Sequence, residues 1–549
     1  MNSKKVLLLC AACLAALCCL GAEEWGWVAS GGGLSGDYAR DVTTDDLGNI
    51  YVIGEFQNYA TFGATTINAH GSTDKDVFVA KLDAGGNWLW AVSAGSAASD
   101  YGRSIITDGV GNVYITGSFE GTPPFGSIIL ESTGYADIFV AKLDCSGNWI
   151  WAKKAGGTAY DEGFAIATDG AGNVYITGYF VNSANFGAYT LPSNGYEDIF
   201  VARLDTNGNW LWAVNAGGTG FGDDSKGYGI AVDDSGNAYI TGYFEDDAEF
   251  GATNLDSSGA WDIYVAKLNN SGNWLWAVNA GGTGNDRGSR IAADASGNAL
   301  ICGYFTGTAT FGTQSLTCAG YSEAYAAKLD ASGNWLWAAS SAVASDSGCN
   351  ASDIELDEAG NTFLAGYFWG AGEVAFGTTT LTSSGGDDIF AAKLDADGNW
   401  LWALGAGGPS SSDQGHGIAV VSSGNAWLTG VYEAATFGDT SLPGNGSWNV
   451  FVAEIPSPAG EPIPLPPANL NLTINGMDVY LDWDDVTEDT TGNPVTIDHY
   501  LVYYLPADPW GDHFAFGSNG SITSSQWVHS GAATSYQKGF YFVTAVTAE

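Results

Sequence analysis

Residues 25–33 read WGWVASGGG, and closely similar phrases recur further along the chain. They are WLWAVSAGS from Trp88, WIWAKKAGG from Trp149, and WLWAVNAGG from Trp210 and again from Trp274. In those later copies the phrase ends a longer repeated unit. The first copy therefore ends a unit whose beginning has not yet appeared, and this oddity decides the fold.

The repeated unit occurs seven times. The Asn that precedes its YITG-like segment recurs at intervals of 61 to 64 residues, at Asn49, Asn112, Asn173, Asn237, Asn298, Asn361 and Asn425. Each unit holds four short runs rich in β-branched and aromatic residues, such as GIAVD, AYITGYF, DIYVAKLN and WLWAVNA in the fourth copy. Gly, Asn and Asp bound these runs, and no helical period is present. The pattern predicts an all-β fold with one four-stranded antiparallel sheet in each unit.

Two junctions in each unit share one turn chemistry. DGAGN (residues 169–173) and DASGN (residues 330–334) place Asp first and Gly fourth. This arrangement is typical of a three-residue hairpin loop with a glycine bulge. Calcium binding is the alternative interpretation, although the loops lack the alternating oxygen ligands of a calcium loop. No other metal or cofactor is predicted.

The chain ends of the repeat region indicate how the units stack. The DIFVAKL-type run occurs seven times, the last being NVFVAEI from Asn449, and no WLWA run follows it. The missing strand is the opening phrase, which a closed ring needs and a linear solenoid does not. We therefore predict a seven-bladed β-propeller over residues 23–455, closed by its N-terminal strand, with residues 25–33 paired against Asn449–Ile455.

The repeat resembles a known family. DIFVAKLD, GNWLWA, AGG, GIAVD and GNAYITGYF together resemble the seven-bladed β-propeller repeat of secreted bacterial proteins, abbreviated SBBP. The resemblance covers residues 25–455 and implies the fold. It implies little about activity, because propellers host unrelated functions.

The ends of the chain carry further signals. Residues 1–22 combine Lys4 and Lys5 with an apolar run and small residues, which predicts a secretory signal peptide and a secreted or cell-surface bacterial protein. Lipidation of Cys10, Cys13, Cys18 or Cys19 remains an alternative on a weak motif. No other apolar run is long enough to span a bilayer. The formal net charge of −44 opposes binding to nucleic acid or bare anionic membrane.

A different domain is expected after the repeats. Residues 456–467 hold six of the fourteen prolines and predict a stiff linker. Residues 468–549 alternate like sandwich strands, and Trp483, Tyr500 and Tyr503 match the pattern of a fibronectin type III-like domain. The resemblance implies a spacer or adhesion module. The sandwich departs from that family because its usual last strand is missing.

The predicted blade order distinguishes two faces. The tight Asp–Gly hairpins share one face, here called the hairpin face, and the longer connections share the opposite long-loop face. Recognition residues usually lie on long loops carried by a rigid scaffold. One position on the long-loop face, two residues before the first apolar residue of the innermost strand, changes its chemistry between units. It reads Arg40, Arg103, Phe164, Tyr228, Ser289, Ser352 and His416.

These seven residues are the candidate ligand-binding ring. Together with recurring loop carboxylates such as Asp100, Asp161 and Asp286, they suit a protein or carbohydrate ligand, with aromatic faces stacking on it. Solvated loop residues without a role are the alternative.

No catalytic residue is predicted, because no nucleophile, phosphate-loop or paired-His motif occurs. We therefore predict a monomeric, non-catalytic binding or scaffold protein. A polysaccharide-degrading glycosidase or lyase that uses paired carboxylates is the alternative. A Cys302–Cys318 disulfide is a further expectation, since export permits it.

Overall fold

The computed structural model describes residues 24–71, 73–108, 111–218, 220, 224–409, 412–421 and 424–457, together with six strand segments between 471 and 547. It divides into two compact units, Met1–Ser457 and Pro458–Glu549. Every regular element in these described residues is a β-strand, so the all-β prediction is confirmed. No helix among them is long and apolar enough to cross a bilayer. The predicted signal peptide and most of the predicted linker lie outside the described residues.

Each repeat forms an antiparallel sheet in which the four predicted runs are neighbours in chain order. The first strands are β2 (Tyr38–Thr44), β8 (Tyr101–Thr107), β14 (Glu162–Thr168), β18 (Ser225–Val232), β22 (Arg287–Ala293), β29 (Ser347–Leu356) and β35 (Gln414–Val420). The second strands are β3 (Ile50–Gln57), β9 (Val113–Phe119), β15 (Val174–Phe186), β19 (Ala238–Phe250), β23 (Ala299–Phe305), β30 (Thr362–Gly370) and β36 (Ala426–Tyr432).

The remaining strands of these sheets follow the same order. The third strands are β6 (Lys75–Leu82), β12 (Asp137–Leu143), β16 (Tyr189–Leu204), β20 (Thr253–Leu268), β26 (Glu323–Leu329), β33 (Asp388–Leu394) and β39 (Asn449–Ile455). The fourth strands are β7 (Trp88–Ala94), β13 (Trp149–Ala155), β17 (Trp210–Ala216), β21 (Trp274–Gly282), β27 (Trp335–Ser340) and β34 (Trp400–Ala406). The last sheet takes its fourth strand from β1 (Val28–Gly31).

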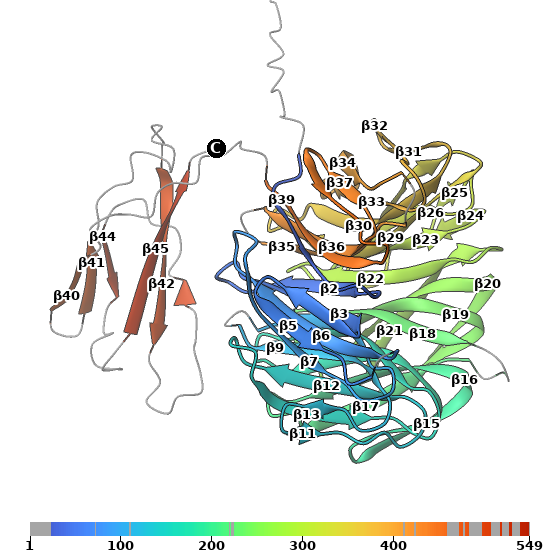
Figure 1. The fold of residues 1–549 in the computed structure, drawn as a ribbon, viewed down its shortest axis with the longest axis horizontal. Helices are drawn as coiled ribbons and strands as arrows, with labels where there is room; N and C mark the ends of the chain where they lie inside the picture. Colours follow the sequence, from blue (N-terminus) through green and yellow to red (C-terminus); the bar gives the residue numbers. More distant parts are fainter. Residues whose placement is uncertain are drawn as a thin grey trace, which may run out of the picture. The chain divides into compact units, whose positions relative to one another are not determined.

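The two ends of the repeat region lie side by side. β1 pairs antiparallel with β39, with Val28 opposite Ala453 and Gly31 opposite Val450. The Trp25 indole N–H donates to the Gly405 carbonyl at 3.1 Å. First strands of successive sheets contact one another, and β35 also contacts β2, so the last and first repeats are neighbours (Figure 1).

The predicted hairpin turns are confirmed. Between β2 and β3, the Gly48 amide donates to the Asp45 carbonyl at 2.9 Å, and Gly48 has a φ of +76°. The Asp45 carboxylate accepts the amides of Leu47 and Asn49 at 3.0 and 2.9 Å. Because this carboxylate is engaged inside the turn, turn geometry explains the recurring Asp better than ion binding. Among the described residues no group of three or more His, Cys, Asp or Glu is placed to hold a metal ion.

Apolar side chains fill the spaces between neighbouring sheets. One cluster joins Ile199 and Val201 of β16 with Ile240 and Phe244 of β19. The second Trp of an outer strand also links repeats, since the Trp90 indole donates to the carbonyl of Cys145 at 3.2 Å in the next repeat. Burying a large apolar side chain contributes about 2 kcal/mol. The repeats therefore stabilise one another and form a rigid support.

The excursion between the second and third strands is more ordered than expected from a long loop. It forms short hairpins, β4–β5 (Tyr59–Phe62, Thr65–Asn68), β10–β11 (Pro124–Phe125, Ile128–Ile129), β24–β25 (Thr308–Phe311, Gln314–Thr317), β31–β32 (Glu373–Phe376, Thr379–Thr382) and β37–β38 (Ala435–Phe437, Thr440–Leu442). β28 (Ala342–Val343) adds a strand to one of them. In the third and fourth repeats the hairpin continues the main strands. The Phe of the FG pair anchors the excursion. Phe62, for example, packs edge-on against Trp88 with ring centroids 4.9 Å apart.

The second unit contains two three-stranded antiparallel sheets. One is β40–β41–β44 (Asn471–Asn475, Asp478–Asp482, Gln526–His529). The other is β43–β42–β45 (Gly517–Ser518, Ile497–Pro506, Gly539–Thr547). Tyr500 and Tyr503 lie in β42, whereas Trp483 lies outside the described residues.

The expected Cys302–Cys318 disulfide is not formed, and both thiols are free. Cys302 lies in the middle of β23 and packs among apolar side chains that include Cys349. Cys318 follows β25, and its thiol lies 3.4 Å from the carbonyl oxygen of Gly320. Both cysteines contact the same apolar cluster, but no disulfide joins them.

Candidate functional site

Every residue of the candidate ring is the extra residue of a β-bulge. The pairing of β2 with β3 skips from Ala39 to Asp41, which leaves Arg40 without an opposite residue. The same shift omits one residue in each of the other six first strands. Those omitted residues are Arg103, Phe164, Tyr228, Ser289, Ser352 and His416. A bulge re-aims a side chain and is common beside functional sites.

The bulges bring the ring together. All seven residues line one open cavity of about 380 Å³ at the start of the first strands. The other side chains of its wall are those of Glu162, Arg287, Arg290, Tyr304, Asn350, Ala351, Tyr367 and Gln414. The size is within the usual range for small-ligand sites. The structure thus places every predicted ring residue around a single opening on the long-loop face, here called the long-loop cavity.

One arc of the long-loop cavity is a row of stacked side chains. Phe164 stacks on Tyr228 with ring centroids 4.7 Å apart and an interplanar angle of 24°. The Arg287 guanidinium lies 3.7 Å from the centroid of Tyr228, and the Arg103 guanidinium lies 5.8 Å from that of Phe164. These neighbours cover the ring faces that we expected to stack on a ligand. The expectation of aromatic stacking is therefore wrong for Tyr228, and the aromatic rings hold the arginines in place.

Two ring arginines have carboxylate partners. Arg40 binds the buried Glu55 with its Nε at 3.1 Å and a terminal nitrogen at 2.5 Å. Burial acts to raise the pKa of Glu55, but Arg40 and other nearby cations lower it overall. Arg103 Nε binds Glu162 Oε1 at 2.6 Å. These pairs fix the direction of both guanidinium groups.

The opposite arc is neutral and polar. It comprises Ser289, Asn350, Ser352, Gln414 and His416. His416 Nδ1 lies 2.7 Å from the Ala39 carbonyl, and its Nε2 lies 3.2 Å from the Gln414 side-chain oxygen. Burial and the nearby Arg40 lower the pKa of His416 to about 4, so the imidazole is neutral near pH 7. A neutral imidazole held on both sides serves as a hydrogen-bonding wall.

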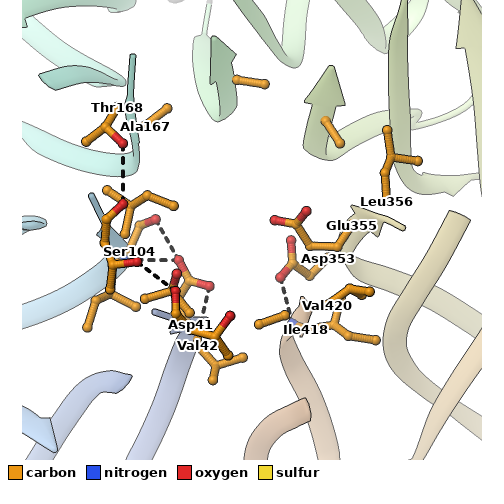
Figure 2. Close-up of a pocket in the computed structure, with 18 of the residues that line it drawn as sticks. Asp41, Val42, Ser104, Ala167, Thr168, Asp353, Glu355, Leu356, Ile418 and Val420 are labelled. Carbon is orange, nitrogen blue, oxygen red and sulfur yellow. Dashed lines mark hydrogen bonds between the residues drawn. The ribbon is translucent and has the colours of Figure 1, made fainter. Parts of the chain in front are cut away.

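A second cavity of about 890 Å³ occupies the end of the channel towards the hairpin face. Figure 2 shows Asp41 and Ser104 on one wall and Asp353 and Glu355 on the opposite wall. Ser104 donates to Asp41 at 2.6 Å, and the Ile418 amide donates to Asp353 at 2.8 Å. Burial raises the pKa of both aspartates, and Arg290 opposes that rise.

Arg290 separates the two cavities. Its side chain lines both, with Nε 3.7 Å from Asp353 Oδ1 and a terminal nitrogen donating to the Tyr228 carbonyl at 2.6 Å. The Tyr228 carbonyl belongs to the bulge of β18. Arg290 therefore ties the acidic cavity to the ring of bulged residues.

The recurring loop carboxylates do not line the long-loop cavity, which corrects our expectation for them. Asp100 is buried and accepts the amides of Ser96 and Glu120 at 2.6 and 3.1 Å. Asp161 and Asp286 accept backbone amides in the same way. Their carboxylates clamp the long connections and are not available to a ligand.

The sequence contains a pattern that indicates the bulges and that the predictions above did not use. The Gly of the YITG-like segment recurs in the middle of every buried second strand, at Gly54, Gly117, Gly178, Gly242, Gly303, Gly366 and Gly430. A Cβ at any of them would collide with a carbonyl of the first strand. Glycine inside a strand often marks a bulge or a close backbone approach. These glycines fix the register of the first strands. That register could have identified three further cavity residues, each two positions before a bulge: Arg287, Asn350 and Gln414.

The comparisons with known proteins agree with the repeat pattern. A family model described as SBBP, beta-propeller repeat, matches residues 92–118, 150–179 and 218–243. The matched residues lie in parts of the first four sheets, from the end of β7 to β19.

Curated relatives are more distant. An uncharacterized WD repeat-containing protein of Acanthamoeba polyphaga mimivirus is 26% identical over 477 residues, covering 69% of this chain and 34% of the relative. Regulatory protein FlaEY of Caulobacter vibrioides is 25% identical over 382 residues, covering 64% of this chain and 38% of the relative. The chain therefore spans little more than a third of the length of either relative. A solved structure of YCF48 bound to D1 peptide has a TM-score of 0.38 and 10% identity, covering 80% of this chain and 96% of that one.

Proposed function

We propose that this chain is an exported, non-catalytic binding protein that holds a protein or glycan ligand in the long-loop cavity. In this proposal the seven sheets are the blades of a closed propeller, and β1 closes the ring. The pairing of β1 with β39 and the contact of β35 with β2 support closure. The second unit acts as a fibronectin type III-like spacer, which its two antiparallel sheets support.

The observation that carries the proposal is the convergence of the bulged residues. Seven first strands each carry one bulge, and all seven displaced side chains line one cavity. Chemistry varies strongly among these positions, whereas the residue directly before each is Ala or Gly and the residue two positions after each is Val or Ile. A rigid ring with one variable residue in each sheet is suited to selective binding.

Binding can be tested with a glycan array and with cell-surface extracts. We expect the full chain to retain a ligand and the triple variant Phe164→Ala, Tyr228→Ala and His416→Ala to lose it. The variant Gly170→Ala is the control, because nothing lies within 4 Å of an added Cβ there. Unchanged affinity in the triple variant would reject this cavity as the site.

A second candidate function is a carboxylate-based glycosidase or lyase at the hairpin-face cavity. Asp41 and Asp353 both line this cavity and burial raises the pKa of both, which favours the function because a carboxyl with a raised pKa is better suited to act as a general acid. Release of reducing ends from polysaccharides, lost in Asp353→Asn, would establish this function. Unchanged release in that variant would exclude these carboxyls.

A further inference from the structure

Arginine is rare in this chain but concentrated at the long-loop cavity. The chain has five arginines, Arg40, Arg103, Arg203, Arg287 and Arg290, against 61 Asp and Glu. Four of the five line the long-loop cavity, whose wall includes one carboxylate, that of Glu162. Carboxylates pair with three of these four arginines, so Arg287 is the source of unneutralised positive charge at this opening, in a protein with a net charge of −44. Such local charge attracts anions even where the whole molecule repels them.

Two of these arginines are rigidly held without using their full hydrogen-bonding capacity. Arg103, Phe164, Tyr228 and Arg287 form the stacked row described above. Stacking fixes the guanidinium planes, so less conformational entropy is lost when an anion binds.

Arg287 is the cation best placed to bind a ligand. Arg40, Arg103 and Arg290 each have a carboxylate within 4 Å, whereas no ion pair of Arg287 occurs in the part of the chain that the structure describes. Its Nε is buried and lacks a hydrogen-bond partner among the described residues. Its side chain hydrogen-bonds with Tyr304, which leaves it a charge that no acidic group neutralises.

The neutral arc indicates what accompanies the anionic group. Ser289, Asn350, Ser352 and Gln414 can each donate and accept hydrogen bonds. This mixed capacity matches ligand hydroxyl groups, which also donate and accept. An acidic peptide offers the charge but few hydroxyls.

We propose, resting on the proposed binding function, that the long-loop cavity takes a carboxylated sugar, namely a uronic-acid unit of an acidic polysaccharide. Its carboxylate binds Arg287 through parallel N–H···O bonds, the geometry that a planar guanidinium provides. Its hydroxyls face Ser289, Asn350, Ser352 and Gln414. A folded protein partner is disfavoured because the cavity holds only about 380 Å³.

The test uses calorimetry of the full chain with oligogalacturonate and with the same oligosaccharide methyl-esterified at its carboxyls. We expect esterification to weaken binding about 10-fold or more, as loss of a charge-assisted hydrogen bond implies. Arg287→Gln should lower affinity for oligogalacturonate by a similar factor and lower affinity for the ester much less, because the ester carbonyl accepts only a neutral-acceptor hydrogen bond. Arg203→Gln is the matched control, because Arg203 pairs with Asp169 at 3.0 Å and does not line the cavity. Circular dichroism checks that each variant is folded.

The outcomes separate this inference from the proposed function. Equal affinity for the acid and the ester, or no effect of Arg287→Gln, would overturn the carboxylate assignment. Binding of poly-glutamate but not oligogalacturonate would also overturn it in favour of an acidic peptide. If a neutral glycan or a protein binds and the triple alanine variant abolishes that binding, the inference fails and the proposed function stands. If the triple variant affects no ligand at all, both fail.

Discussion

Removing Arg290 should destabilise the protein in a pH-dependent way. Arg290 lies 3.7 Å from Asp353, and it also lowers the pKa of Asp41 across the channel. Arg290→Ala leaves two buried carboxyls, each at most 7% exposed, without this cation. Breaking a buried ion pair from one side costs about 3–5 kcal/mol when the remaining group stays charged.

The cost should shrink at low pH. Burial already raises the pKa of Asp41 and Asp353 above the unfolded value, so their contribution to stability is full below about pH 4 and declines as pH rises through the folded pKa. Loss of Arg290 raises both pKa values further and deepens that decline. As pH falls, more of these carboxyls become neutral, and the cost approaches that of the lost hydrogen bond to the Tyr228 carbonyl, about 1–2 kcal/mol.

Urea unfolding of the full chain, followed by tryptophan fluorescence at pH 5 and pH 8, measures this difference. We expect Arg290→Ala to cost about 2 kcal/mol more at pH 8 than at pH 5. Adding Asp353→Asn should recover part of the loss at pH 8. An equal cost at both pH values would refute the electrostatic account of Arg290.

Three further predictions concern other features of the molecule. Gly178→Ala should lower the free energy of unfolding by more than about 3 kcal/mol, because the added Cβ would collide with the Glu162 carbonyl. Gly170→Ala should have little effect, and thermal denaturation of the two variants compares them. Because the pKa of His416 is lowered to about 4, its contribution to stability is present above about pH 6.5 and is lost as pH falls towards 4. His416→Gln should make the melting temperature depend less on pH across that window. Trp25→Ala removes an edge-on contact with Phe437 at 5.2 Å and a hydrogen bond to Gly405, and should lower stability by about 3 kcal/mol; limited proteolysis would then cut first near residues 24–33.

Much of the fold could be predicted because the same pattern of strands and turns recurs in seven repeats. Each Asp–Gly hairpin and each strand type has a local pattern, and the unmatched opening phrase indicated which strands pair. The register of the bulges was not predicted, although the glycines at Gly54 and its equivalents encode it. The repeat pattern alone identified the seven variable positions. The direction of each of those side chains, however, depends on the one-residue register shift at its bulge.

The character of the site depends on contacts that no spacing reveals. Phe164 and Tyr228 are 64 residues apart, and only the arrangement of neighbouring sheets brings their rings together. The loop aspartates were expected to be available to a ligand, but they accept hydrogen bonds from backbone amides. Long connections leave such amides without strand partners. Arg287 was overlooked because the prediction took one variable position from each repeat, and Arg287 lies two residues before that position.

Disulfide trapping of the first and last strands tests the closed ring most directly. Ala29 lies opposite Val452, and both belong to one apolar cluster. In chains without residues 1–22 and with Cys145→Ser, the pair Ala29→Cys and Val452→Cys should cross-link under mild oxidation and migrate faster on a non-reducing gel. The pair Ala29→Cys and Ala453→Cys should not, because adjacent strand residues point to opposite faces. Cross-linking in neither pair, or equally in both, would contradict closure by β1.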